Sequence, residues 1–139
     1  SRPASRFVAN FVGSPSMSFL PVSRVTDRDG KALVTLPDQS EVQTQIPTNS
    51  LPSGDGLTLG IRAEAVRVAA DGSTRGKSDV IERLGERTLA YVRLSDNSTI
   101  VAEDTGNSRL AVGESVSLRL DGASAHLFDA QDKAYHAAS

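Results

Sequence analysis

The chain has 139 residues, which is enough for one domain with a sizeable hydrophobic core. Its 15 Lys and Arg residues are balanced by 17 Asp and Glu residues, and the formal net charge of −2 argues against nucleic-acid binding, which favours a strongly basic surface. It has no cysteine, which excludes disulfides, thiolate metal ligands and cysteine nucleophiles, and it has no run of about 18 apolar residues that would predict a membrane span.

Residues 1–15 carry the pattern of a short helix with its start and stop signals. Pro3 suits the first turn of a helix, and Phe7 and Phe11 lie four positions apart on one apolar face. Gly13 and Pro15 then end the helix. Such an apolar face needs a partner, so we expect the sequence to be a piece of a longer protein. We also expect the helix that carries this face to fold back onto the chain, to exchange with a second copy or to drive association.

The rest of the chain consists of short segments in which apolar and polar residues alternate. This alternation is typical of half-buried strands. Strands are predicted over 17–25, 31–36, 41–46, 57–62 with a continuation through 64–69, 80–84, 88–95, 99–103, 115–120, 125–128 and 134–136. Strands of this length and spacing predict an all-β chain built as a small barrel or sandwich.

Turn residues separate these strands. Asp29-Gly30 and Asp96-Asn97 predict tight hairpin turns. Longer loops are predicted over 47–56, 71–76 and 106–114, which are rich in Gly, Pro, Ser, Asp and Asn.

Residues 71–78 end in Gly-Lys-Ser, as a phosphate-binding P-loop does. A P-loop needs a glycine five residues before its second glycine, so that backbone N–H groups wrap around the phosphates. Asp71 stands at that position, and its carboxylate would repel a phosphate. Because the flanks also predict strand–loop–strand rather than strand–loop–helix, we interpret the segment as a polar surface loop.

No other pattern in the sequence predicts catalysis. The two histidines, His126 and His136, lie in or near different predicted strands without carboxylates at ligand spacing, and a zinc site needs three or four ligands. No serine lies in a Gly-x-Ser-x-Gly pattern or next to a paired base. The charged residues of 82–93 are of both signs and predict a mixed-charge surface. We therefore expect no catalytic, cofactor or metal site in the chain.

Two segments carry long sequence patterns that are typical of a known protein family. Residues 3–20 read Pro-Ala-Ser-Arg-Phe-Val-Ala-Asn-Phe-Val-Gly-Ser-Pro-Ser-Met-Ser-Phe-Leu. They resemble the ATP-binding subunits of sugar-importing ABC transporters, which commonly have Pro-Ala-x-x-Phe-Val-Ala-x-Phe-Ile-Gly-Ser-Pro-x-Met-Asn-Phe-Leu at the junction between the ATPase domain and its C-terminal extension. Residues 59–66, Leu-Gly-Ile-Arg-Ala-Glu-Ala-Val, resemble the family's Leu-Gly-Ile-Arg-Pro-Glu-His-Val. Residues 80–85 and 125–129 also look like landmarks of the family, in chain order.

Three of the departures from the family pattern change the type of side chain. Ser18 stands where the family usually has Asn, and Ala63 and Ala65 replace the usual Pro and His. A polar contact that relatives make through that histidine is therefore not available here.

The resemblance implies that residues 1–15 are the last helix and junction of an ATPase domain and that 16–139 are a TOBE (transport-associated OB) domain. The expected fold is an all-β, OB-like (TOBE/MOP-like) β-barrel preceded by one short N-terminal α-helix. The family binds ATP and Mg²⁺ through a P-loop, a Walker B acid and a signature sequence that all precede this junction. The parent chain is thus expected to be an ATPase that drives carbohydrate import, whereas this piece is expected to hydrolyse no ATP.

The resemblance also implies the partners of the chain. In the family the extension contacts its copy in a homodimer, the ATPase domain contacts transmembrane permease subunits, and in some members the extension binds a regulatory protein. The expected location is the cytoplasm, peripheral to the inner face of the cell membrane.

Two pairs of residues are candidates for these contacts. Arg6 and Phe19 match junction positions implicated in regulator docking; alternatively, Phe19 belongs to the core and Arg6 holds the helix to its ATPase domain. Arg62 and Glu64 lie two positions apart on a predicted strand and would point to one face. They could pair reciprocally across a two-fold axis as a dimer seam, or form an ion pair within one chain.

Two further functions remain open. A small-ligand sensor, as in molybdate-type relatives that bind an oxyanion, would need clustered backbone N–H groups, hydroxyls and a lysine at a dimer seam, but Ser14, Ser16 and Lys31 are scattered. A nucleic-acid-binding OB domain is disfavoured by the aromatic content of 4% and by the negative net charge.

Overall fold

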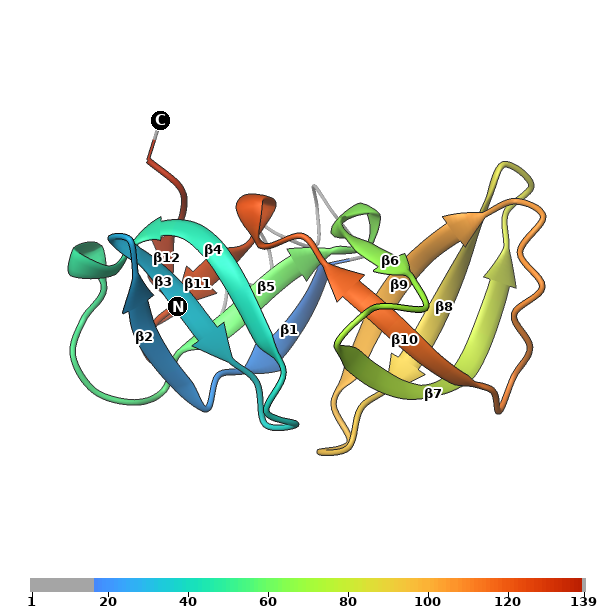
Figure 1. Ribbon diagram of the computed structural model, residues 1–139, viewed down its shortest axis with the longest axis horizontal. Helices are drawn as coiled ribbons and strands as arrows, with labels where there is room; N and C mark the ends of the chain where they lie inside the picture. Colours follow the sequence, from blue (N-terminus) through green and yellow to red (C-terminus); the bar gives the residue numbers. More distant parts are fainter. Residues whose placement is uncertain (1–16, 139) are drawn as a thin grey trace.

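The computed structural model of the chain describes residues 17–138 (Figure 1). The helix predicted over 1–15, and with it Arg6, lies outside the described residues. The strands and 3-10 turns are β1 (Met17–Pro21), β2 (Arg24–Arg28), β3 (Lys31–Thr35), β4 (Glu41–Pro47), η1 (Thr48–Ser50), β5 (Thr58–Arg62), η2 (Ala63–Ala65), β6 (Val66–Val68), β7 (Thr74–Arg83), β8 (Arg87–Arg93), β9 (Thr99–Thr105), β10 (Ser115–Leu120), η3 (Gly122–Ser124), β11 (His126–Phe128) and β12 (Ala134–Tyr135). Among the described residues, no helical segment is long and apolar enough to cross a bilayer.

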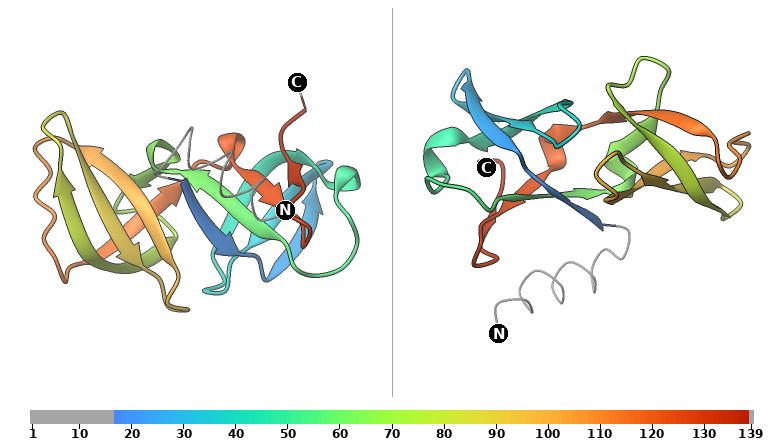
Figure 2. Two further views of the ribbon diagram at one scale, coloured as in Figure 1. Left: turned by 180° about the vertical axis from the view of Figure 1, so that it is seen from behind. Right: turned by 90° about the horizontal axis from the view of Figure 1, so that it is seen from below.

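The strands form two lobes that lie side by side along the long axis (Figures 1 and 2). One lobe combines a sheet of order β1-β5-β11-β12 with a sheet of order β2-β3-β4, and the other is a closed barrel of order β10-β6-β9-β8-β7. The chain enters the barrel through η2 after β5 and returns through η3 before β11. Because β5 and β11 pair with each other, the barrel is an insertion between two neighbouring strands of the first lobe. The expected all-β, OB-like fold is confirmed.

The tight turns follow from local sequence, as predicted. Asp29 and Gly30 have φ values of 53° and 81° and join β2 to β3. Two consecutive positive φ values match the right-handed twist of the flanking strands, and Asp-Gly is a favoured pair for that geometry. Asn97, with a φ of 71°, has the same left-handed conformation in the turn between β8 and β9.

The single strand predicted over 17–25 is wrong, because the chain changes sheets within it. The backbone N–H of Val22 donates to Leu57 O at 3.1 Å, whereas the next N–H, of Ser23, donates to Thr35 O at 2.8 Å. β1 therefore pairs with β5, and β2 pairs with β3 in the other sheet. An alternating sequence does not show which sheet a strand joins.

Two more boundaries differ from the predictions. The strand 57–62 does not continue through 64–69: the turn η2 redirects the chain, and β6 belongs to the barrel. The loop predicted over 71–76 is shorter, because β7 begins at Thr74 and pairs with β10.

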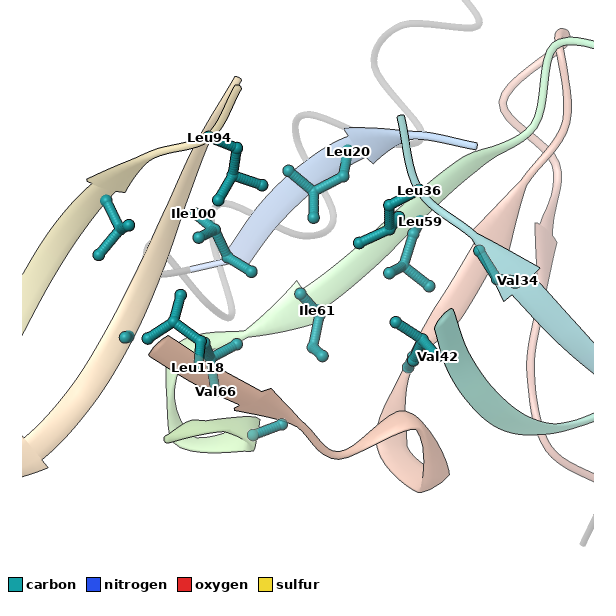
Figure 3. Close-up of a cluster of buried hydrophobic side chains, with 14 of the residues drawn as sticks. Leu20, Val34, Leu36, Val42, Leu59, Ile61, Val66, Leu94, Ile100 and Leu118 are labelled. Atoms are coloured by element: carbon teal, nitrogen blue, oxygen red, sulfur yellow. The ribbon is translucent and has the colours of Figure 1, made fainter. Parts of the chain in front are cut away.

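One continuous hydrophobic core joins the two lobes. Figure 3 shows side chains from both lobes gathered around β5, where Ile61 lies between the two groups. The largest fully buried side chains of the core are Leu20, Val34, Leu36, Val42, Ile46, Leu59, Ile61, Val66, Val92, Ile100, Leu118 and Leu127. Since the cluster contains residues from strands of both lobes, burial of these apolar side chains stabilises both lobes together.

Buried hydrogen bonds also cross between the lobes. The backbone N–H of Val101 in β9 donates to Ser18 Oγ in β1 at 2.9 Å. The hydroxyls of Ser40, before β4, and Thr74, in β7, lie 2.9 Å apart. These contacts satisfy polar groups that would be costly to bury without a partner.

Candidate functional site

The outer face of the sheet β1-β5-β11-β12 brings several candidate residues together. Leu20, Leu59, Ile61 and Leu127 point into the core, so the alternate residues of the same strands point to the opposite side of the sheet. We call this surface the aromatic–histidine face; its members are Phe19, Gly60, Arg62, His126, Phe128 and His136.

The strand register places two family landmarks next to each other. In β5 and β11, Gly60 of the Leu-Gly-Ile-Arg segment pairs with His126. On its other side Gly60 pairs with Phe19 of β1. Figure 2 shows blue β1, green β5 and red β11 side by side, although they are far apart in the sequence.

Gly60 makes room for an aromatic ring on this face. A Cβ atom at Gly60 would lie 2.7 Å from Cε1 of Phe128 and 3.2 Å from Sδ of Met17. The Phe128 ring therefore passes over the glycine, and the Phe19 ring meets it edge-on with centroids 5.8 Å apart. This edge-to-face geometry is favourable for aromatic pairs.

The two histidines, which the sequence placed in different strands, come together on this face. The ring centroids of His126 and His136 are 6.0 Å apart, and those of His126 and Phe128 are 6.5 Å apart. Burial, followed by the positive charge of Arg62 and the proximity of His136, lowers the pKa of His126 below its ordinary value of 6.5. The uncharged imidazole is thus the favoured form of His126 at neutral pH.

The structure brings together some of the predicted site residues and not others. Phe19 and Arg62 are both half-buried and belong to the aromatic–histidine face. Glu64 is exposed at the centre of η2, so the premise that Arg62 and Glu64 lie on one strand is wrong. The turn η2 rotates Glu64 away from the β5 alternation; the seam itself stays a prediction. Arg6 lies outside the described residues.

Sequence reasoning did not predict that His126 and Phe128 lie on the same face as Phe19 and Arg62. The segment 125–129 was available as a signal because it resembles a family landmark. Its pairing with β5, however, spans the whole inserted barrel and cannot be read from local sequence.

The segment 71–78 does not form a phosphate-binding loop. Residues from Thr74 onward are part of β7, and Gly76 packs so closely on β8 that a Cβ atom would lie 2.5 Å from Arg93 O. A strand directs successive N–H groups to opposite sides and does not wrap them around one anion. Among residues 17–138, no group of three or more His, Cys, Asp or Glu could hold a metal ion.

The three arginines of 82–93 each contact oxygens of neighbouring residues. Arg93 Nε lies 3.0 Å from Asp79 Oδ2, and Arg87 Nη1 lies 3.1 Å from Glu103 Oε1. Arg83 donates to the backbone oxygens of Ser108 and Leu110 at 2.8 and 2.7 Å.

The fold defines a class of protein: a two-lobed all-β chain in which an OB-like barrel is inserted between paired strands of a second lobe. Within that class, the chain belongs to the TOBE domain family, whose sequence pattern matches residues 59–128, from β5 through the barrel to β11.

The curated relatives carry the names of importer ATP-binding proteins. The chain is 37% identical over 139 residues to the alpha-glucoside transport ATP-binding protein AglK of Rhizobium meliloti, covering 98% of this chain and 38% of that protein. It is 43% identical over 137 residues to the sn-glycerol-3-phosphate import ATP-binding protein UgpC of Chromohalobacter salexigens, covering 94% of this chain and 35% of that protein. A maltose/maltodextrin import ATP-binding protein MalK of Salmonella typhi is 35% identical over 94 residues. The chain thus spans little more than a third of the length of the first two relatives.

A solved structure shares the fold. The cytoplasmic molybdate-binding protein ModG matches with a TM-score of 0.64 and 16% sequence identity, covering 82% of this chain and 95% of that chain.

Proposed function

We propose that the chain is the C-terminal regulatory and dimerisation domain of the ATP-binding subunit of an ABC importer for sugars or related solutes. The observation that carries this proposal is the alignment of 98% of the chain with 38% of an alpha-glucoside transport ATP-binding protein. The parent subunit would couple ATP hydrolysis to import at the inner face of the cell membrane, in contact with permease subunits. ATP and Mg²⁺ would be bound by its ATPase domain, since residues 71–78 lack the geometry of a phosphate loop.

The proposed role of the chain is to bind its own copy and to receive a regulatory protein. Two features support an interaction role for the aromatic–histidine face. Aromatic and arginine side chains dominate the energetics of protein interfaces, and Phe19 and Arg62 are of these types and only half-buried. We assign regulator docking to Phe19 with Arg6, and the dimer seam to Arg62 with Glu64.

The test of self-association is the solution mass of the 139-residue chain, measured by light scattering over a concentration series. A mass that rises from 14.6 kDa toward twice that value supports the proposal. The variant Glu64→Arg would then place like charges across the two-fold axis and should raise the dissociation constant at least about tenfold. A monomer at every concentration contradicts self-association by this chain.

The matched control is Glu86→Arg. Glu86 is also an exposed glutamate in a turn, between β7 and β8 of the barrel lobe. Its substitution by arginine makes the same change of charge as Glu64→Arg. If Glu86→Arg weakens the dimer as strongly as Glu64→Arg, net charge and not the proposed seam controls association.

A second candidate function is oxyanion sensing. The observation that favours it is the shared fold with a protein named as molybdate-binding. Molybdate added to the chain would then raise its melting temperature, and sulfate is the control anion. No shift with molybdate excludes this candidate.

A further inference from the structure

A cleft of about 390 Å³ lies in the first lobe, and none of its lining residues belongs to the aromatic–histidine face. Its walls are the start of β2 and the loop between η1 and β5, which swings out beside β2 in Figure 1. The volume falls within the range of about 300–1,000 Å³ that is typical of small-molecule sites. The lining residues are Val22, Ser23, Arg24, Val25, Thr48 and 51–57.

The floor of the cleft is apolar and fixed to the fold. Val22, Val25 and Leu51 pack against the main core, and Leu57 is only 9% exposed. A hydrogen bond of 3.1 Å from the N–H of Val22 to Leu57 O closes the floor between the two walls. This floor offers a firm surface to a small carbon skeleton.

The rim is rich in hydrogen-bond donors that have no partner within residues 17–138. The Arg24 guanidinium is exposed and makes no ion pair there, and Ser23 and Ser53 add two hydroxyls. The backbone N–H groups of 53–56 also donate no hydrogen bond within the described residues. Gly54 and Gly56 have φ values of 103° and 93°, which lets this loop curve around the cleft.

One acceptor completes the cleft. The Asp55 carboxylate lines it and makes no ion pair within residues 17–138. A carboxylate accepts hydrogen bonds from hydroxyl groups.

From this arrangement we propose that the cleft binds a small hydroxylated organic anion of the phosphate-ester class. The guanidinium and the free N–H groups match the oxygens of a phosphate, because forked guanidinium donors and successive backbone N–H groups both suit anions. Asp55 accepts hydrogen bonds from hydroxyl groups, and the carbon skeleton lies on the floor. The proposal is independent of self-association, because no cleft residue belongs to the aromatic–histidine face or the proposed seam.

The test is an NMR titration of the ¹⁵N-labelled 139-residue chain with glycerol 3-phosphate. Saturable shifts confined to the amides of 22–25 and 48–57, with a dissociation constant of about 1 mM or below, are expected. Glycerol alone should cause no shift, and inorganic phosphate should bind at least about tenfold more weakly because it lacks the hydroxylated skeleton. Absence of saturable shifts, or equal binding of inorganic phosphate, overturns the proposal.

Variants test whether binding depends on residues of the cleft or only on the net charge of the chain. Arg24→Gln should weaken binding about tenfold or more, since it removes a charge-assisted hydrogen bond. Arg28→Gln is the matched control, because Arg28 is an exposed arginine of the same strand outside the cleft, and it should bind like the parent chain. Asp55→Asn should reduce the preference for glycerol 3-phosphate over inorganic phosphate. If Arg24→Gln and Arg28→Gln weaken binding equally, the cleft is not the site.

Discussion

Replacing Gly60 by alanine tests how the aromatic–histidine face is built. The new methyl group would lie 2.7 Å from Cε1 of Phe128 and 3.2 Å from Sδ of Met17. Phe128 is only 3% exposed and its ring is in contact with Phe19, so it has little room to retreat. We expect the ring to be displaced and the fold to lose stability.

Two opposing effects set the size of this loss. Overpacking a well-filled site costs about 1–3 kcal/mol. Alanine is compatible with the extended backbone of β5. Because it lowers the entropy of the unfolded chain relative to glycine, it stabilises the fold by about 0.4–1 kcal/mol. The free energy of unfolding should thus fall by about 1–2 kcal/mol, which corresponds to a melting temperature lower by about 3–7 °C for a chain of this size.

The assay is thermal and urea unfolding followed by circular dichroism, with a double-mutant cycle. Phe128→Leu alone creates space and should cost about 1–2 kcal/mol. In Gly60→Ala/Phe128→Leu the methyl group occupies part of that space, so the combined loss should be smaller than the two single losses together. If the losses add to within about 0.5 kcal/mol, the ring and the glycine are not coupled and the account of this face is wrong.

Two more substitutions probe contacts of the same sheet. Ser18→Ala removes the buried acceptor of the Val101 N–H and should lower the free energy of unfolding in urea by about 1–3 kcal/mol. The control is Ser117→Ala, which removes a hydroxyl without a hydrogen bond among the described residues. It should lower the free energy of unfolding by less than about 0.5 kcal/mol. Burial and the Arg62 charge lower the pKa of His126, so the unfolded chain binds its proton more readily and stability should fall as the pH decreases below about 6.5. Arg62→Gln should raise the pKa of His126 in an NMR titration; an unchanged or lower pKa contradicts this electrostatic account.

Much of the fold could be predicted because its signals are local. The alternation of Val42, Thr44 and Ile46 requires only that one side of a strand be buried, and all three are buried in β4. The turn at Asp29-Gly30 depends on the backbone conformations of two neighbouring residues. Such features need no knowledge of distant parts of the chain.

The candidate site was predicted in part, from two kinds of signal. Phe19 was predicted from its place in a family segment and Arg62 from its spacing on a predicted strand, and the structure puts both on one face. For His126 the sequence showed a family landmark over 125–129 and too few ligands for a metal site, and neither signal shows which residues it contacts. Its contact with Phe128 and His136 depends on how β11 pairs.

Local sequence signals are sufficient to predict the all-β class, the positions of most strands and the hairpin turns. Three features depend on the folded chain as a whole: residues 17–25 divide between two sheets, Glu64 leaves the strand of Arg62, and β5 and β11 pair across an inserted barrel. Alternation specifies which side of a strand is buried, whereas the pairing of a strand depends on the packing of the common core and on long-range hydrogen bonds.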